Sequence, residues 1–225
     1  MTASAGRSRW GSTGGAALRG LLVAAAGAAA FGVLLGLVAA RWPPLARLNA
    51  YAARVLPPMT AAQPADLHTM TALSFIGTDE AHLVMLAPVV GWLLWRRRVG
   101  LALWSVVVVV AAAALNGGVK LLAARPRPPA ADRLVAASGY GFPSGHADAA
   151  VVTYAVLLTV FLPVLARWWR VVVTAVALLI VLSTGFSRVA LGVHYVSDVL
   201  GGFALGLTWA MLGLVALLMT PARRR

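Results

Sequence analysis

Six apolar stretches separated by short polar segments dominate the pattern of this chain. They cover residues 21–40, 81–95, 99–124, 149–166, 171–186 and 199–219. A helix that crosses a bilayer needs about 20 predominantly apolar residues, and somewhat shorter runs suffice when their polar ends reach the interface. The second stretch is the shortest, and we expect its helix to extend backward past Glu80 and Asp79. The pattern therefore predicts an all-α, polytopic membrane protein with six transmembrane helices.

The composition excludes an ordinary water-soluble protein. Of the 225 residues, 61% are hydrophobic and 11% are charged, whereas an average soluble domain has about 25% charged residues. One aqueous core of this size cannot bury so much apolar surface, so lipid must cover much of it. The chain has no cysteine, which excludes disulfides, thiolate metal ligands and a cysteine nucleophile.

The net charge of +13 raises the question of a nucleic-acid partner. The basic residues, however, fall in short groups between the apolar runs and form no continuous basic face. Such groups are typical of the loops that set membrane orientation, because loops rich in Lys and Arg resist translocation. We therefore expect the bilayer, and no nucleic acid, as the partner.

The distribution of charge predicts the orientation. With the N-terminus inside, eleven basic residues fall on the cytoplasmic side, while eight basic residues and all six acidic ones fall on the opposite side. Tryptophans flank the cytoplasmic arginine groups, as interface anchors do; they are Trp92, Trp95, Trp168 and Trp169. We predict a multi-pass plasma-membrane protein with both termini in the cytoplasm and residues 1–20 as a cytoplasmic tail.

A cleaved signal peptide is the alternative interpretation of the first stretch, because Arg7, Arg9 and Arg19 precede it. Its apolar run exceeds the roughly 7–15 residues of a signal-peptide core. The length favours a retained helix.

Residues 42–70 form the longest segment between the predicted spans. It contains five prolines, which predict that no long helix forms there; they are Pro43, Pro44, Pro57, Pro58 and Pro64. Apolar residues between the prolines recur at helical spacing, from Leu45 to Leu56. The segment is either an extracytoplasmic loop with a short helix in the headgroup plane or a plain connecting loop.

The first interruption of the apolar pattern is Lys120, near the end of the third stretch. An ionisable group at membrane depth is costly and indicates function, although a lysine can also extend its amine to the headgroups. Pro126 and Pro128 end the helix and keep the chain extended, so Arg127 can turn back toward Lys120. We expect Arg125 and Arg133 to contact lipid headgroups.

The second interruption is the segment of residues 139–146, which reads GYGFPSGH and leads into the fourth predicted helix. Glycines let backbone N–H groups approach an anion, and a helix N-terminus presents unpaired N–H groups. The segment therefore predicts an anion site. In the alternative interpretation Ser144 only caps the helix, and His146 then has no explanation.

The third interruption contains Ser187, Arg188, His194 and Asp198. In a helix His194 and Asp198 would share one face. The carboxylate could then accept one imidazole N–H and leave the other nitrogen with its lone pair, as in a nucleophile or base. A structural His–Asp pair is the alternative.

Together, the three places predict a phosphoryl-transfer site. Lys120, Arg127 and Arg188 supply cations and Gly145 a backbone donor, and two histidines lie on the same side of the membrane. Phosphoryl transfer needs charge neutralisation, an in-line nucleophile and a proton for the leaving oxygen. The chain has no carboxylate cluster that would hold a metal, so we expect the basic residues to serve instead, without metal or cofactor.

The three motifs resemble those of the type 2 phosphatidic acid phosphatase superfamily, also called lipid phosphate phosphatases. They read KxxxxxxRP over residues 120–128, PSGH over 143–146 and SRxxxxxHxxxD over 187–198. Every motif position matches, whereas residues before Val99 carry no signature beyond hydropathy. The resemblance implies one membrane-embedded phosphatase domain over residues 1–225, with a helix-bundle catalytic core over residues 99–219.

The resemblance also implies a role for each motif residue. Lys120, Arg127 and Arg188 would hold the phosphate oxygens, and Ser144 and Gly145 would add hydrogen bonds. His194 would attack phosphorus to form a phosphohistidine, with Asp198 orienting its ring. His146 would protonate the leaving lipid alkoxide and then activate water. His68 and His82 receive no role, and Asp148 is expected either to support the catalytic residues from behind or to lie at the entrance of the site.

The expected substrate is a lipid phosphate or pyrophosphate that reacts without leaving the bilayer, through a cleft that opens sideways between helices with residues 42–70 at its rim. Phosphatidate, phosphatidylglycerophosphate and polyprenyl pyrophosphate all fit, and an outward-facing site favours the last. The oligomeric state cannot be derived from the sequence.

Two rival functions remain at this stage. Vanadate-dependent haloperoxidases resemble this chain in motif, but they are soluble, which the hydropathy contradicts. A non-catalytic lipid-binding or transport protein with an inactive pocket is the other rival. The complete set of candidate catalytic groups argues against it.

Overall fold

The structure is a computed structural model that describes residues 5–220, and for residues 5–13 and Asp79 it describes the backbone alone. All regular elements in this part of the chain are helices, which confirms the all-α prediction. The α-helices are α1 (Ala5–Ala39), α2 (Pro43–Ala61), α3 (Pro64–Phe75), α4 (Asp79–Trp95), α5 (Val99–Ala123), α6 (Gly145–Phe161), α7 (Arg167–Ala190) and α8 (Val196–Met219). Two short 3₁₀ turns cover Ala130–Asp132 and Leu162–Val164.

Five of the described helices are long and apolar enough to cross a membrane: α1, α5, α6 with the turn that follows it, α7 and α8. The helices α3 and α4 meet at a bend of 44° and pass the same test only as a pair, which is either one broken span or a re-entrant loop. The described residues thus contain five or six candidate spans, and the predicted six correspond to the bent pair counted as one span. The second span does extend backward to Asp79, as its shortness suggested.

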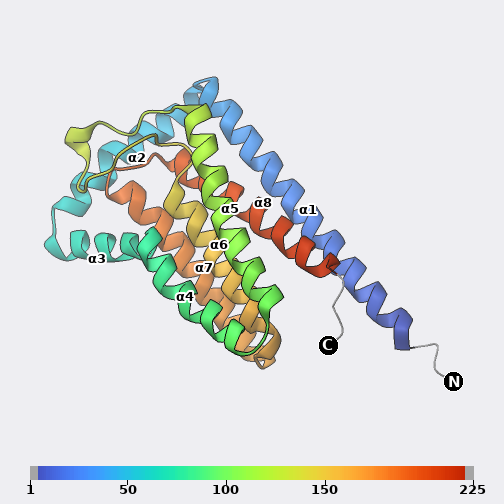
Figure 1. Cartoon of the computed structure of the whole chain (residues 1–225). Helices are drawn as coiled ribbons and strands as arrows, with labels where there is room; N and C mark the ends of the chain where they lie inside the picture. Colours follow the sequence, from blue (N-terminus) through green and yellow to red (C-terminus); the bar gives the residue numbers. More distant parts are fainter. Residues whose placement is uncertain (1–4, 221–225) are drawn as a thin grey trace.

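Successive spans run in opposite directions, so one end of the bundle collects the end of α5, the start of α6, the end of α7 and the start of α8 (Figure 1). The helix α8 packs between α1 and α6. A Cβ at Gly206 would lie 2.8 Å from the carbonyl oxygen of Asp148, so glycine here lets α8 approach the backbone of α6. All three motifs consequently lie at the same end of the bundle.

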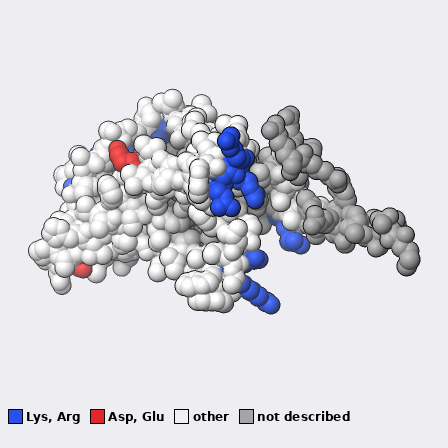
Figure 2. All heavy atoms as spheres, turned by 60° about the horizontal axis from the view of Figure 1, so that its bottom comes forward, with Lys and Arg blue, Asp and Glu red and all other residues white. Residues whose placement is uncertain are grey.

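The opposite end of the bundle carries exposed basic side chains in the turn that joins α4 to α5 and in the first turn of α7. They are Arg96, Arg97, Arg98, Arg167 and Arg170. Figure 2 brings this end forward and shows Lys and Arg side chains gathered on it, with few acidic ones. The motif end and the basic end are thus opposite faces of one bundle, as the predicted orientation requires.

The prediction for residues 42–70 was wrong in one respect, because two helices occupy this segment and α2 alone has 19 residues. Pro43 and Pro44 lie in the first turn of α2, where a missing N–H costs nothing. Pro57 and Pro58 lie inside the helix, but they remove only two donors. Burial of one face of α2 against the bundle maintains the helix across that gap. Figure 1 shows α2 lying across the motif end of the bundle.

The buried core near the middle of the bundle is formed by α4, α5 and α6. Leu86, Val108 and Val156 belong to one cluster of buried apolar side chains, and Trp104 packs against it. Large apolar side chains on the outward faces of the spans, such as Val107 and Leu179, are exposed. An apolar surface of this kind suits contact with lipid, so the fold presents the motif residues at the end of a lipid-embedded scaffold.

Candidate active site

The three motif segments converge on His194, which is buried between the loop after α5 and the start of α8. Its Nε2 atom lies 2.8 Å from Nη1 of Arg127. The same guanidinium nitrogen donates to the carbonyl oxygen of Val193 at 3.0 Å. Arg127 therefore contacts a histidine that lies 67 positions away in the sequence. The chain after α5 turns back toward the bundle, as we expected from the prolines around Arg127.

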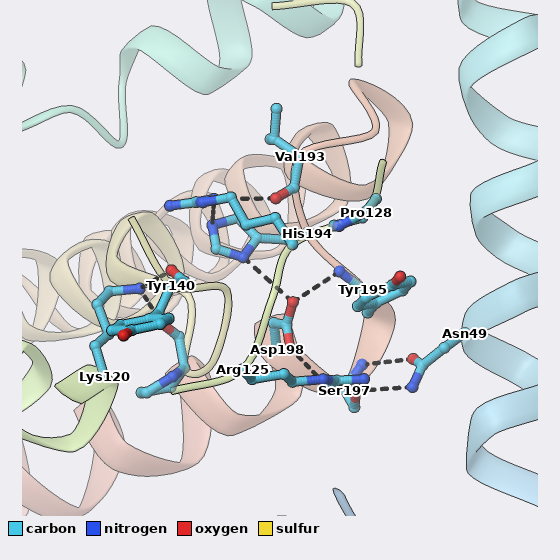
Figure 3. Close-up of polar contacts among 12 residues, drawn as sticks. Asn49, Lys120, Arg125, Pro128, Tyr140, Val193, His194, Tyr195, Ser197 and Asp198 are labelled. Atoms are coloured by element: carbon cyan, nitrogen blue, oxygen red, sulfur yellow. Dashed lines mark hydrogen bonds and ion pairs between the residues drawn. The ribbon is translucent and has the colours of Figure 1, made fainter. Parts of the chain in front are cut away.

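Asp198 lies on the side of the His194 imidazole opposite to Arg127 (Figure 3). The Nδ1 atom of His194 lies 3.4 Å from Oδ2 of Asp198. His194 precedes α8 and does not lie within it, since Tyr195 caps the helix. Asp198 still faces the ring because it occupies the first turn of α8 and accepts the backbone N–H of Tyr195 at 2.9 Å.

These two contacts define the state of the imidazole. A carboxylate beside Nδ1 favours a hydrogen on that nitrogen, which leaves Nε2 with its lone pair. Burial lowers the pKa of His194 to about 4, although the nearby Asp198 acts in the opposite direction. His194 is consequently neutral near pH 7, with Nε2 directed toward the cations.

The start of α6 presents hydrogen-bond donors to the same region. Asp148 N–H makes the first bond within the helix, to the carbonyl oxygen of Ser144 at 3.1 Å, so the N–H groups of Gly145 and His146 precede the helical ladder. The Ser144 N–H donates to the carbonyl oxygen of Asp198 at 2.8 Å, which ties the second motif to the third. These links fix the position of the helix N-terminus relative to His194.

Ser144 does not cap α6 with its side chain. Its Oγ atom is fully buried and has no hydrogen-bond partner among the described residues. Ser144 thus occupies the N-cap position, as the alternative interpretation had it, but its side chain makes no capping bond. A buried hydroxyl without a partner is uncommon and requires an explanation, and an anion at this helix N-terminus would supply one.

Lys120 and Arg127 hold the loop of residues 139–146 against the end of α5. The Nζ atom of Lys120 donates to the carbonyl oxygens of Pro143 at 2.6 Å and Tyr140 at 3.2 Å. The Nε atom of Arg127 donates to the carbonyl oxygen of Gly139 at 3.2 Å. Burial lowers the pKa of Arg127 from its ordinary value, but a guanidinium remains charged at neutral pH. Both side chains thus order the anion-binding loop, and Arg127 keeps its charge beside it.

Arg188, at the end of α7, is 6% exposed. Its Nη1 atom donates to Oγ of Ser74 in the last turn of α3, while its Nε atom has no partner among the described residues. Ser74 lies in the part of the chain without a family signature, and no pattern in the sequence connects it to this site. The bent span α3–α4 therefore contributes to the positioning of a motif arginine.

His146 lies in the first turn of α6, beside the turn that joins α3 to α4. Arg188 and His194 are among the titratable side chains that face it. Gly77 in that turn packs against the ring, since a Cβ at this position would lie 3.2 Å from Cβ of His146 and would also meet Cγ2 of Thr184. Both histidines of the motifs are thus present at one site, with Arg188 beside them.

Gly77→Ala should move His146 and weaken the protein. The added methyl would meet Thr184 and His146, and overpacking of this kind costs about 1–3 kcal/mol. We expect a lower melting temperature and a lower kcat, measured by thermal unfolding and by phosphate release. Gly100→Ala is the matched control, because a Cβ there has no neighbour within 4 Å. Equal activity and melting temperature of Gly77→Ala and the wild type would contradict this packing.

The expectation that Arg125 and Arg133 contact lipid headgroups was wrong. Arg125 lies 2.5 Å from Oδ1 of Asp198 through its Nη1 atom. Arg133 donates to the carbonyl oxygens of Pro128 and Ala137, at 2.8 and 3.0 Å. The loop after α5 folds back over the start of α8, so both guanidinium groups turn into the protein.

A lateral cavity of about 680 Å³ lies between α4, α5 and α6. Its walls are mostly apolar and include Leu86, Val109 and Ala113, with Asp148 and His82 also in the lining. Asp148 lies beside this cavity. Residues 42–54 line a different cavity, between α2 and the loop after α5. The sideways cleft with residues 42–70 at its rim stays a prediction.

No group of three or more His, Asp or Glu residues in residues 5–220 is arranged to hold a metal ion. The charged groups that surround His194 are Arg127, Arg188 and Asp198. With the donors of Ser144 and Gly145, this set can neutralise and orient a tetrahedral anion.

Comparison with known proteins links this site to characterised phosphatases. The profile of the PAP2 superfamily matches residues 101–222. Phosphatidylglycerophosphatase B of Bacillus subtilis strain 168 is 35% identical over 148 residues, which make up 64% of this chain and 72% of that protein. The match to the superfamily includes all three motif segments.

Two solved structures resemble the fold. The crystal structure of a transmembrane PAP2 type phosphatidylglycerolphosphate phosphatase from Bacillus subtilis has a TM-score of 0.79 and 28% identity, and the match covers 90% of this chain and 99% of that one. LpxE of Aquifex aeolicus has a TM-score of 0.59 and 20% identity, with coverage of 74% and 94%. The second comparison is a similarity of fold alone.

Proposed function

We propose that this chain, which belongs to the PAP2 superfamily and is a membrane lipid phosphate phosphatase, forms its covalent intermediate on Nε2 of His194. One observation carries the proposal: Nδ1 of His194 faces Asp198 at 3.4 Å, while Nε2 faces Arg127 at 2.8 Å. The ring thus has its lone pair on the side where the cations gather. This arrangement supports a nucleophile and is not needed for a purely structural His–Asp pair.

In the binding step, the phosphate of the lipid takes the place of Nε2 as the acceptor of the Arg127 N–H. Arg188 and Lys120 neutralise its oxygens, and Ser144 Oγ and the N–H of Gly145 donate to them. Charge stabilisation of this kind by preorganised donors is the main source of catalysis in phosphoryl transfer. The partnerless Oγ of Ser144 and Nε of Arg188 support this role.

In the first chemical step, the Nε2 lone pair of His194 attacks phosphorus, and the bond from phosphorus to the lipid oxygen breaks. His146, protonated in the complex with substrate, gives its proton to that oxygen, so the lipid leaves as an alcohol. The imidazole of His194 becomes positively charged as the phosphorus–nitrogen bond forms. Asp198 beside Nδ1 stabilises this charge.

In the second step, the now neutral His146 accepts a proton from water, and the resulting hydroxide oxygen attacks phosphorus. The phosphorus–nitrogen bond breaks, its electron pair returns to Nε2, and inorganic phosphate departs. Every group, including the protonated His146, is then back in the state it had in the substrate complex. The scheme needs no metal, so phosphate release should continue in EDTA.

Phosphatidylglycerophosphate is the substrate that we propose for this site. The support is the similarity to phosphatidylglycerophosphatase B, at 35% identity. Polyprenyl pyrophosphate, which the sequence alone favoured, and phosphatidate are the competing substrates. A panel of the three lipids, assayed for phosphate release by purified protein in detergent with EDTA, should give the highest kcat/KM for phosphatidylglycerophosphate. A higher value for polyprenyl pyrophosphate would overturn this assignment.

We further propose that the lateral cavity between α4, α5 and α6 holds an acyl chain of the substrate. Its volume of about 680 Å³ lies within the range of about 300–1,000 Å³ that is usual for ligand sites. Its apolar walls lie within the membrane-spanning part of the bundle. The headgroup would thus react at the motif end while its chain stays in an apolar environment.

Ala113→Phe should test the acyl-chain site, because it adds a ring to the lining of the cavity. We expect KM for a long-chain substrate to rise about tenfold or more, since each buried methylene contributes about 0.8 kcal/mol, while a short-chain analogue is little affected. Ala114→Phe, on the next residue and outside the cavity lining, is the control. An equal effect on both chain lengths would contradict the assignment.

For the orientation, we propose that the motif end faces the extracytoplasmic side and the basic end the cytoplasm. The basic turns beside Arg97 and Arg167 support this, because basic loops stay inside. The chain lacks cysteine, so single-cysteine variants test it directly. A membrane-impermeant maleimide should label Ala136→Cys and spare Ala166→Cys in intact cells, since both residues are exposed and lie at opposite ends of the bundle. The reverse labelling would contradict the orientation.

A further inference from the structure

We propose that Arg125, which is outside the expected phosphate-binding set, is a positioning residue that holds the carboxylate of Asp198 toward His194 and offsets its charge. The proposal rests on the function proposed above for His194 and Asp198. It assigns a role to the first arginine of the sequence Arg125-Pro126-Arg127-Pro128, whose two arginines contact opposite sides of the His–Asp pair.

The two oxygens of Asp198 have different partners. Oδ1 accepts from Nη1 of Arg125 at 2.5 Å. Oδ2 accepts the backbone N–H of Tyr195 at 2.9 Å and lies 3.4 Å from Nδ1 of His194. Because Arg125 engages Oδ1, the carboxylate cannot rotate without losing this contact, and Oδ2 stays directed toward the imidazole.

Burial makes this contact energetically important. The side chain of Asp198 is fully buried, and a buried carboxylate is strongly unfavourable unless it is paired and hydrogen-bonded. Arg127 contacts Nε2 of His194 and Arg188 contacts Ser74, whereas Arg125 contacts the oxygen of Asp198 that does not face His194. Arg125 is therefore the cation that compensates Asp198 while the other two remain available to substrate.

Arg125 is itself held from two sides. Its Nη1 atom also donates to Oγ of Ser197 at 2.7 Å, and its guanidinium carbon lies 4.7 Å from the centre of the Tyr195 ring. Asn49 of α2 donates to Oγ of Ser197 at 2.9 Å and accepts the Ser197 N–H at 3.1 Å. The chain of contacts from Asn49 to His194 is visible in Figure 3. Through these contacts, α2 helps to hold Asp198 in its position beside His194.

The guanidinium of Arg125 can be reached from outside the protein. The Arg125 side chain is 18% exposed and lines a cavity of about 730 Å³ between α2 and the loop after α5. Arg54 lines the same cavity. Free guanidinium ion should therefore be able to occupy the space that truncation of Arg125 creates.

The test is chemical rescue of Arg125→Ala. Purified variant and wild type are assayed for kcat and KM with phosphatidylglycerophosphate, with and without guanidinium chloride, against sodium chloride at the same ionic strength. We expect kcat to fall about 10- to 100-fold, by analogy with groups that orient a metal-ligating histidine, with little change in KM because Arg125 is outside the proposed phosphate-binding set. Guanidinium should restore a large part of the lost kcat, and Arg125→Lys should retain more activity than Arg125→Ala.

The acid limb of the pH profile of kcat/KM gives a second readout of the role of Arg125. Asp198, Arg127, Arg188 and His146 are the titratable and charged groups that face His194. Without Arg125, the negative charge of Asp198 acts on His194 with no compensation, so the pKa of His194 should rise from its value of about 4. The acid limb should then move to higher pH in Arg125→Ala and return when guanidinium is added. Titration of the substrate alone supplies the correction for its own phosphate ionisation.

Two controls complete the experiment. Arg54→Ala removes an arginine from the same cavity and should show wild-type kcat and no response to guanidinium. Ser197→Ala keeps Arg125 but removes the hydroxyl that holds it, and should give a smaller loss of kcat without rescue, which covers the case in which Arg125→Ala fails to fold.

Several outcomes would overturn the proposal. They are a wild-type kcat in Arg125→Ala, a defect confined to KM, and a folded variant whose kcat and acid limb do not respond to guanidinium. A further measurement separates failure of the role proposed for Arg125 from failure of the function proposed for His194. The wild type and Arg125→Ala are quenched during turnover of labelled substrate, and the labelled phosphohistidine is measured. Absence of phosphohistidine in the wild type contradicts the function, whereas equal rates of labelling in both proteins contradict only the role of Arg125.

Discussion

His194→Ala should lower kcat for phosphate release by roughly 10⁴- to 10⁶-fold, because loss of a nucleophile in a comparable catalytic unit costs about 10⁶-fold. The variant removes the nitrogen that faces Arg127 at 2.8 Å and, with it, the partner of Asp198 on the other side of the ring. Water alone would then have to attack phosphorus within the cationic site. The measurement is release of inorganic phosphate by purified protein in detergent with EDTA present.

The matched control is His68→Ala. His68 lies on α3 and is exposed, so its removal should leave kcat and KM within about twofold of the wild type, as is usual for surface substitutions. Retention of more than a few per cent of wild-type activity by a folded His194→Ala would rule out this residue as the nucleophile.

Asp198→Asn is the second large effect that we expect, at about 10⁴-fold in kcat by analogy with the same change in a catalytic triad. An asparagine amide has the size of the carboxylate, but it lacks the charge that stabilises the imidazolium formed during attack. It also has only one acceptor oxygen, whereas Asp198 uses both, toward Arg125 and toward Tyr195 and His194. One of these partners must then face the amide NH₂.

Asp66→Asn, an exposed carboxylate on α3, is the corresponding control and should behave as the wild type. KM in Asp198→Asn should change far less than kcat, because Asp198 does not contact the phosphate. A large rise in KM with an unchanged kcat would show that the carboxylate acts in binding and would contradict its assigned role.

The convergence of the motifs was predictable because it follows from topology. Successive spans alternate in direction, so the end of α5, the start of α6 and the turn between α7 and α8 must lie at the same end of the bundle. Short motifs at these ends are then close in space although residues 120 and 198 are far apart in sequence. The turn of Arg127 toward the site was predictable for a similar local reason, since the two prolines around it prevent the helix from continuing.

The environment of Asp198 was not predictable in the same way. Arg125 and Arg127 are two positions apart in an extended segment, so their side chains point in different directions, and the sequence alone does not say which direction leads into the protein. In the structure both side chains point into the protein, because Arg125 contacts Asp198 and Arg127 contacts His194 at the start of α8. Asn49 and Ser74 were missed because neither belongs to a motif and each acts through a contact with a distant segment.

The length of α2, which exceeds the short helix that was one alternative, and the whole of α3 were missed for an energetic reason. Prolines oppose helix formation locally, and the prediction that no long helix forms in residues 42–70 rested on that effect alone. Burial of Leu45, Asn49 and Ala52 against the bundle outweighs it. The packing of α2 against the bundle also places Asn49 beside Ser197, and so connects α2 to His194 and Asp198. The wrong prediction for α2 and the missed contact of Asn49 therefore have one cause.

Trapping of the covalent intermediate shows whether His194 is the nucleophile. The wild-type protein is mixed with substrate carrying a labelled phosphate, quenched in alkali within the first turnover, and digested for mapping of the labelled peptide. We predict label on His194 that is stable in alkali and lost in acid, as expected for a phosphorus–nitrogen bond, and no label in His194→Ala. Label on another residue, or rapid turnover with no trapped label in the wild type, would contradict the account.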